Sequence, residues 1–225
     1  MTNPEKRRVG ISILLLAAVA FPVAAYAQGF KFSNEDKAQG EAKAERQKRI
    51  DAQLSTPCRD RIKNRKIVVL IGEDINGVVQ AKQSSFSPHF DAINARLQNL
   101  GLRTYTQEEI RKQVAQAEID AYFKNNPDAA LSAAKRLAAN YTLKGLISSR
   151  AMRNPMMPVN QVAVSMQFVL TGADGKRVAQ ADAQSQSYSG ADVQGMALTL
   201  INEQAEEVVA KLYSEYCLQP ESGRK

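Results

Sequence analysis

The sequence predicts one domain of the α/β (α+β) class, with a mixed sheet of about five strands covered by about four helices. Residues 67–71 form an unbroken aliphatic run, which is typical of a strand buried on both faces. Segments with helical spacing of apolar residues alternate with further strand patterns along the chain. Residues 161–170 and 177–188 alternate apolar and polar side chains around a turn, which predicts an antiparallel pair and therefore a mixed sheet.

The N-terminus has the three parts of a secretory signal peptide. Lys6, Arg7 and Arg8 precede an almost wholly apolar stretch, and Ala25-Tyr26-Ala27 forms an A-x-A cleavage site. We expect residues 1–27 to be removed after Ala27, which places the mature protein in a bacterial periplasm. An uncleaved anchor would need a longer apolar run, since a spanning helix takes about 20 residues.

The charge balance excludes one class of partner. Removal of residues 1–27 takes away three basic residues and one acid, so the net charge falls from +7 to +5. This mildly basic balance suits weak attraction to anionic envelope polymers and is not the footprint of a nucleic-acid-binding protein. No lipid-modified cysteine follows the signal, so we expect no stable membrane insertion after cleavage.

The mature chain is expected to have three parts. Residues 28–57 are polar with almost no apolar stripe, so they form either a disordered linker or a solvated helix. That segment is a spacer or a partner-binding arm. Residues 58–217 form the α/β domain, and 218–225 a disordered tail. The domain opens on a basic run, 59–65, which we interpret as a solvated face.

Two cysteines lie at the ends of this domain. Cys58 precedes the first strand, and Cys217 lies at the end of the last helix. Their spacing is not that of a C-x-x-C redox pair, and disulfides persist in exported proteins. We therefore predict a Cys58–Cys217 disulfide, which chain entropy would make worth about 5 kcal/mol. Two separate small core residues are the alternative.

The first half of the domain is predicted from local signals. A central strand over 66–73 is followed by an ambiguous stretch, 78–86. Ser87-Pro88 then begins a helix that Gly101 ends, and 102–105 is a short strand. Thr106 and Glu109 form a capping box, and the helix that it opens runs without a break to a position before Asn125.

The second half is predicted as one helix, three strands and a last helix. Asn126 caps a helix whose first residue is Pro127. Strands over 141–152, 161–170 and 177–188 follow, the last with the polar character of a sheet edge. A turn over 171–176 joins the last two strands. The final helix begins at Ser189 or Asp192 and ends near Cys217.

Candidate catalytic groups are few, and we predict no catalytic, cofactor-binding or metal-ligating residue. The single histidine, His89, lies in the first turn of a helix, where an exposed or packing role is expected. Ser165 and Ser185 have no base nearby in the sequence. Glu73 and Asp74 follow the central strand, where α/β sheets place their sites. They form either a solvated turn or a carboxylate pair that binds a cation or acts as acid and base.

A loop rich in methionine is the candidate partner contact. Met152 precedes the proline-containing loop 154–158, and Met156 and Met157 lie within it. Methionine side chains make adaptable hydrophobic contacts, so we expect them to contact a protein. A soft metal such as Cu(I) is the alternative ligand.

Three segments carry a family resemblance: Leu100–Tyr105 (LGLRTY), Ala133–Gly145 (AAKRLAANYTLKG) and the Thr171–Val178 hairpin. Together with the central strand they resemble the periplasmic α/β domain of CsgG-like curli-secretion proteins, LpoB-type activators of penicillin-binding proteins and the FlgT middle domain. The resemblance covers about residues 60–215. The chain departs from the family in lacking a lipobox cysteine and pore-forming insertions.

The resemblance implies a non-enzymatic envelope protein that binds other proteins. The leading hypothesis is therefore a soluble periplasmic adaptor or assembly factor in flagellar, cell-wall or secretion machinery, with contacts through 152–158 and the last edge strand. The alternative is a periplasmic ligand-binding or hydrolytic domain that uses the Glu73/Asp74 end of the central strand.

Overall fold

The computed structural model describes residues 33–75, 77–83, 87–153, 155, 159–189 and 191–219. Residues 1–39 and 40–225 are two separate compact units, and the sheet with its helices belongs to the second. The predicted signal peptide and residues 220–225 lie outside the described residues. The described helices are α1 (Ser33–Leu54), α2 (Arg59–Ile62), α3 (Ser87–Asn99), α4 (Gln107–Gln113), α5 (Gln116–Phe123), α6 (Pro127–Arg136) and α7 (Val193–Leu218).

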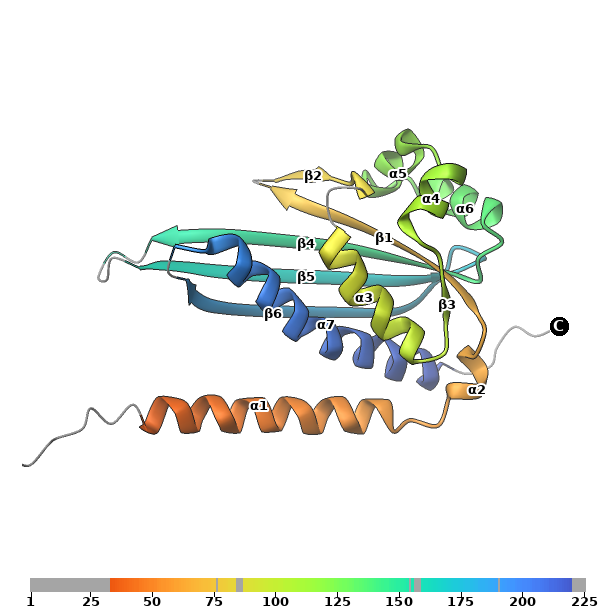
Figure 1. Cartoon of the computed structure of the whole chain (residues 1–225). Helices are drawn as coiled ribbons and strands as arrows, with labels where there is room; N and C mark the ends of the chain where they lie inside the picture. The colour runs from red at the N-terminus through yellow and green to blue at the C-terminus, as the bar shows by residue number, and fades with distance from the viewer. Residues whose placement is uncertain are drawn as a thin grey trace, which may run out of the picture. The chain divides into compact units, whose positions relative to one another are not determined.

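Six strands form one sheet, which is mixed as predicted and has one strand more than the five or so expected (Figure 1). They are β1 (Lys66–Ile75), β2 (Val78–Gln80), β3 (Arg103–Thr104), β4 (Tyr141–Arg153), β5 (Asn160–Gly172) and β6 (Arg177–Ser189). The order is β2-β1-β4-β5-β6, and β3 pairs with β1. β1 and β4 are parallel, whereas β4–β5 and β5–β6 are antiparallel. Residues 67–72 are buried, so the central strand is confirmed.

α3 and α7 cover one face of the sheet, which we call the helix-covered face (Figure 1). α7 packs on β5 and β6, and α3 packs on β1 and on α7. The alternate residues of β5 that point toward these helices are all buried. They are Val162, Val164, Met166, Phe168 and Leu170. This burial confirms the half-buried strand that the alternation predicts.

α5 packs on the opposite face, over β1 and the start of β4. A Cβ on Gly72 would lie 2.6 Å from Cε1 of Phe123, so the glycine makes room for this ring. Lys144 donates a hydrogen bond to the Tyr122 carbonyl at 3.2 Å and lies over both aromatic rings of α5. Burial there lowers the pKa of Lys144. Beyond Lys144 no described helix covers this face.

The single helix predicted from Thr106 to before Asn125 is wrong, because the chain forms two helices there. α4 ends at Gln113, and Val114 adopts extended backbone angles with its side chain buried. On a continuous helix Ile119 would lie about 180° away from Ile110. The break turns α5 so that both residues are buried.

Most of the basic run 59–65 is solvated as predicted, with Arg59 and Lys63 exposed, but Arg61 packs against the end of the chain. Arg61 donates to the carbonyls of Cys217 and Gln219, and its guanidinium lies 5.2 Å from the centre of the Tyr216 ring. Beside it the structure joins Cys58 and Cys217 in a disulfide, with 5.5 Å between their Cα atoms. The start and the end of the α/β unit are therefore held together by one cluster.

The second half of α1 packs along α7. Ile50 is buried, and Arg49 pairs with Glu207 at 3.2 Å. Arg46 lies 3.9 Å from Glu203, one turn further along both helices. Glu41 and Glu45, which lie between these arginines and the start of the unit, are exposed.

Candidate interaction surface

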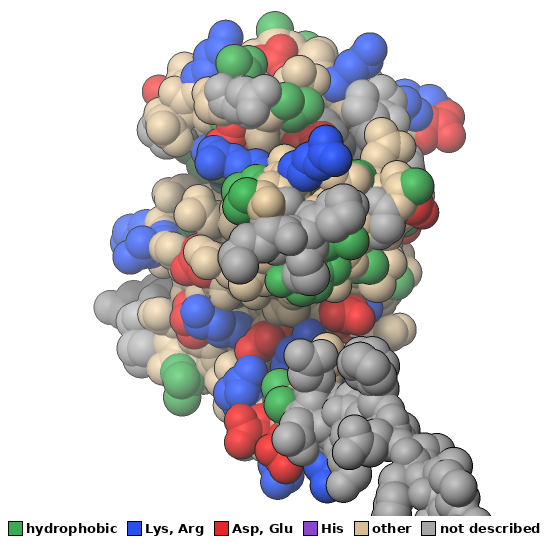
Figure 2. Space-filling model, turned by 90° about the vertical axis from the view of Figure 1, so that its left-hand side faces the viewer, with side chains coloured by type: hydrophobic (Ala, Val, Ile, Leu, Met, Phe, Trp, Pro, Cys, Tyr) green, Lys and Arg blue, Asp and Glu red, His purple; other side chains and the backbone are tan. Residues whose placement is uncertain are grey.

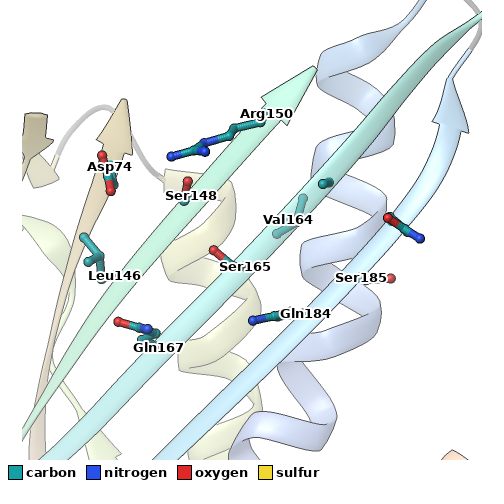
Figure 3. Close-up of a pocket in the computed structure, with 11 residues that line it drawn as sticks. Asp74, Leu146, Ser148, Arg150, Val164, Ser165, Gln167, Gln184 and Ser185 are labelled. Carbon is teal, nitrogen blue, oxygen red and sulfur yellow. The ribbon is translucent and has the colours of Figure 1, made fainter. Parts of the chain in front are cut away.

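Over three long strands, none of the described helices covers one face of the sheet. We call this surface the open face and define it by twelve alternate side chains: Leu146, Ser148, Arg150 and Met152 of β4, Gln161, Ala163, Ser165 and Gln167 of β5, and Asp182, Gln184, Gln186 and Tyr188 of β6. In Figure 3 its polar side chains lie on the near side of the sheet, with helices behind. All are exposed or half-buried.

The register arranges the open face in cross-strand rows. Ser148, Ser165 and Gln184 form one row, and Asp74 of β1 is level with Ser148. Arg150, Ala163 and Gln186 form the next. Directly opposed side chains in a sheet have Cβ atoms about 5 Å apart, so each row is a continuous strip.

An open groove of about 650 Å³ lies on this face (Figure 3). Its wall consists of Asp74, Leu146, Ser148, Arg150, Ala163, Val164, Ser165, Gln167, Gln184, Ser185 and Gln186. Most of the polar groups are hydroxyls and uncharged amides, which both donate and accept hydrogen bonds. Arg150 points toward Ser148 and Asp74 in Figure 3. The groove therefore offers hydrogen bonds with little fixed charge.

The last row of the open face combines two large exposed side chains. Met152, Gln161 and Tyr188 are level with one another on three neighbouring strands, and we call them the tip row. Met152 is 52% exposed and Tyr188 54%, although both are large and apolar over most of their surface. Ile75, Val78 and Val79 are also exposed, at the β1–β2 hairpin. Figure 2 looks onto this end of the molecule and shows hydrophobic side chains among lysines and arginines.

Glu73 and Asp74 do not meet. β1 continues to Ile75, so both acids lie within a strand and point to opposite faces. Glu73 accepts a hydrogen bond from the Ser149 hydroxyl at 3.4 Å on the helix-covered side. Asp74 accepts from the Gly77 amide at 2.7 Å and fixes the β1–β2 turn. Two carboxylates on opposite faces cannot act together on one bond.

The other sequence candidates are dispersed. His89 is half-buried in α3, on the side of the sheet away from Ser165, and burial lowers its pKa. Met152 lies in the tip row, whereas Met156 and Met157 are outside the described residues. Within the described ranges, no group of three His, Cys, Asp or Glu side chains could hold a metal ion. None of the described helices has the length and apolarity needed to span a bilayer.

Sequence reasoning missed most of the open face. It placed candidate chemistry at strand ends and loops, and it interpreted the polar residues of β6 only as the mark of an edge. Polar residues stand at alternate positions of two strands, Ser148 and Arg150 on β4 and Ser165 and Gln167 on β5. This pattern was the sequence signal for a polar face of the sheet. What it could not show is that no helix covers those residues.

Comparison with known proteins does not show a family for this chain. No protein-family model and no curated protein matches the sequence. A lipoprotein of Neisseria meningitidis (GNA1162) is similar in structure over 64% of this chain and 98% of its own, with 13% identity and a TM-score of 0.46.

Two other solved structures show comparable similarity. The PelC dodecamer of Paraburkholderia phytofirmans matches over 67% of this chain and 88% of its own, at 19% identity and a TM-score of 0.40. The LpoB C-terminal domain of Salmonella enterica matches over 59% and 95%, at 15% identity and a TM-score of 0.34. LpoB is thus among the structural neighbours, whereas the resemblance to CsgG-like proteins and FlgT stays an expectation.

Proposed function

We propose that this chain is an exported, non-enzymatic adaptor or assembly factor of the bacterial envelope, which binds another envelope protein through its open face. The observation that carries the proposal is the tip row, where Met152 and Tyr188 are exposed beside a hydrogen-bonding groove. Methionine and tyrosine are enriched in protein interfaces, where a few such anchors supply most of the binding energy.

Two further features support this proposal. The predicted signal peptide and the Cys58–Cys217 disulfide suit an oxidising compartment outside the cytoplasm. The sequence resemblance to LpoB-type proteins implies protein binding without catalysis. The partner belongs to flagellar, cell-wall or secretion machinery. The genes that neighbour the gene of this chain would indicate which of the three.

Affinity capture with matched charge variants tests the proposal. The mature chain, the double variant Met152→Asp/Tyr188→Asp and the variant Lys176→Asp are used as baits for envelope extracts. Both variants lower the net charge by two, but Lys176 lies in the β5–β6 turn at the other end of these strands. We expect the double variant to lose one captured protein that wild type and Lys176→Asp both retain. Equal capture by all three baits, with native circular dichroism, would contradict the proposal.

The enzymatic alternative is tested by Glu73→Gln. Glu73 lies away from the open face, so an adaptor with this substitution should keep both its partner and its cellular phenotype. A ligand-binding or hydrolytic site that used Glu73 without Asp74 would lose its function while the partner was still captured. A lost phenotype with intact capture would therefore favour the alternative.

A further inference from the structure

The free edge of β6 has a defined hydrogen-bonding phase. β6 is the last strand of the sheet order, and its pairing with β5 is continuous from Val169–Gln180 to Asn160–Ser189. In an antiparallel strand, alternate residues direct both the amide and the carbonyl to the same side. If the amide of one β6 residue is known to point away from β5, every second residue from it also directs its amide and carbonyl away from β5.

Gln180 shows which residues of β6 direct their backbone groups away from β5. Its amide donates to the Glu215 carboxylate of α7 at 2.8 Å, so it points away from β5. The amides of Asp182, Gln184, Gln186 and Tyr188 then point outward as well. For these four residues the described part of the chain supplies no acceptor comparable to Glu215. A row of outward donors and acceptors therefore lies open from residue 182 to 188, although the Tyr188 carbonyl also accepts from the Ser187 hydroxyl at 3.5 Å.

α7 blocks this edge at Gln180 through Glu215, but the segment 182–188 lacks the sequence features by which natural sheets prevent edge-to-edge pairing. Such edges usually carry lysine, proline, a bulge or an inward-pointing charge. Residues 180–188 contain neither lysine nor proline, and Asp182 is their only charge, in a chain with 24% charged residues. The irregularity in β5–β6 pairing lies at Leu170/Thr171, away from the open segment.

We propose that the β6 edge pairs antiparallel with the β6 edge of a second copy of this chain, around a twofold axis at Ser185. Asp182 then lies opposite the second copy's Tyr188, and Gln184 opposite the second copy's Gln186. The four outward residues of each copy form four hydrogen-bonded pairs, with about eight backbone hydrogen bonds between the copies.

The arrangement of charge and polarity favours a second copy as the occupant. The pairing is self-complementary, since an amide side chain meets an amide and the only charged residue meets a tyrosine. The two Asp182 carboxylates are six residues apart along the joined strands, or about 20 Å. Glu215 and the end of α7 stay outside the paired segment, because they occupy the edge at Gln180.

This pairing joins two open faces on one side of a continuous sheet. Opposed residues in a sheet share a face, so Gln184 and Gln186 of both copies would extend the row pattern of the open face across the axis. The inference does not rest on the proposed function, because it concerns the backbone edge of β6. The two surfaces share Tyr188, so a capture test with Met152→Asp alone, on β4, leaves the paired edge intact.

The mass of the mature chain in solution tests the pairing. Sedimentation equilibrium over a concentration series is compared for wild type, Gln184→Pro and Gln184→Ala. Proline removes the outward amide without removing a β5–β6 hydrogen bond, whereas alanine keeps the amide. We expect twice the chain mass for wild type and Gln184→Ala, and a single chain mass for Gln184→Pro. A wild-type protein with a single chain mass at every concentration overturns the proposal, as does a natively folded Gln184→Pro with twice the mass.

Oppositely charged variants at positions 184 and 186 test whether Gln184 lies opposite the second copy's Gln186. They also give a result if Gln184→Pro does not fold. Gln184→Lys/Gln186→Lys places lysines opposite lysines in a self-pair, and Gln184→Glu/Gln186→Glu places acids opposite acids. Each variant alone should have a single chain mass, and their equimolar mixture should recover twice that mass. Two variants that each remain at twice the mass, or a mixture that stays at the single mass, would exclude this register.

Discussion

At the scale of single residues, Gly145 and Phe168 form the tightest contact of the sheet. They are directly opposed on β4 and β5, and Phe168 is fully buried. The ring occupies the space above the glycine, so an added Cβ would lie 2.9 Å from Cδ1 of Phe168. The absence of a side chain at position 145 thus allows a large ring to pack on the helix-covered face.

We predict that Gly145→Ala destabilises the domain by about 1–3 kcal/mol, because an extra methyl group overpacks the core. Chemical denaturation followed by circular dichroism measures the change. Gly40→Ala is the control, since nothing lies within 4 Å of its added Cβ, and alanine favours the helix by about 1 kcal/mol. A Gly145→Ala protein as stable as wild type would show that the ring can move aside.

His89 makes the free energy of unfolding depend on pH, and its effect can be separated because it is the single histidine of the chain. Burial lowers its pKa below the ordinary value of 6.5, so the unfolded chain binds this proton before the folded one does. Stability should therefore fall as the pH drops from 6.5 to the lowered pKa, and it should be constant with respect to this group below that value.

The corresponding prediction concerns His89→Gln. Between pH 7.5 and 5.5 the wild-type free energy of unfolding should decrease, and the variant should lose less over the same interval. Denaturation curves at both pH values give the comparison. Parallel losses in the two proteins would mean that His89 is not the group responsible.

At the scale of elements, local signals predict where helices begin better than where they end. The capping box at Thr106 is present as predicted, with the Glu109 amide donating to the Thr106 hydroxyl and the Thr106 amide donating to the Glu109 carboxylate at 2.8 Å. These bonds lower the pKa of Glu109. Asn126 and Asp192 likewise begin α6 and α7. Such signals act within four residues, so the sequence alone reveals them.

Thr106→Ala should cost about 1 kcal/mol of domain stability, because the cap of α4 loses its side-chain acceptor. Lys112→Ala, in the same helix, removes an exposed pair with Glu108 and leaves both hydrogen bonds of the capping box in place, so it should change stability by less than about 0.5 kcal/mol. Thermal unfolding of both variants makes the comparison. Equal shifts in the two would argue against the cap as the source of the loss.

Other elements depend on contacts that the sequence does not display. The break between α4 and α5 buries Ile119, which lies on the wrong side of a continuous helix for the stripe of Ile110. The strand alternation predicts β4 to β6, but it does not say that α5 stops over Lys144 and leaves Ser148 and Ser165 uncovered. The open face follows from the placement of helices, which is a long-range property.

At the scale of the whole molecule, the disulfide joins residues that are 159 positions apart. Arg61 adds hydrogen bonds to the Cys217 carbonyl, so the first short helix and the last long helix are held at one place. The chain-entropy argument gives about 5 kcal/mol for a loop of this length, against a total stability of about 5–15 kcal/mol for an ordinary domain.

We therefore predict that reduction strongly lowers the denaturation midpoint of the mature chain, with a loss of up to about 5 kcal/mol. Cys58→Ser/Cys217→Ser should reproduce the loss without reductant. Urea titrations with and without reductant measure it, and the double variant should no longer respond to reductant. An unchanged midpoint on reduction would show that the cluster of Arg61 and Tyr216 holds the ends without the covalent bond.

The central claim is that the open face binds a different envelope protein, and site-specific photo-crosslinking in cells tests it most directly. A photoreactive residue is placed at Gln161, in the middle of the tip row, and in a second strain at Lys176, at the opposite end of the same strands. We predict one discrete adduct with another protein from Gln161 and none from Lys176. No adduct at Gln161, or the same adducts from both positions, would contradict the account.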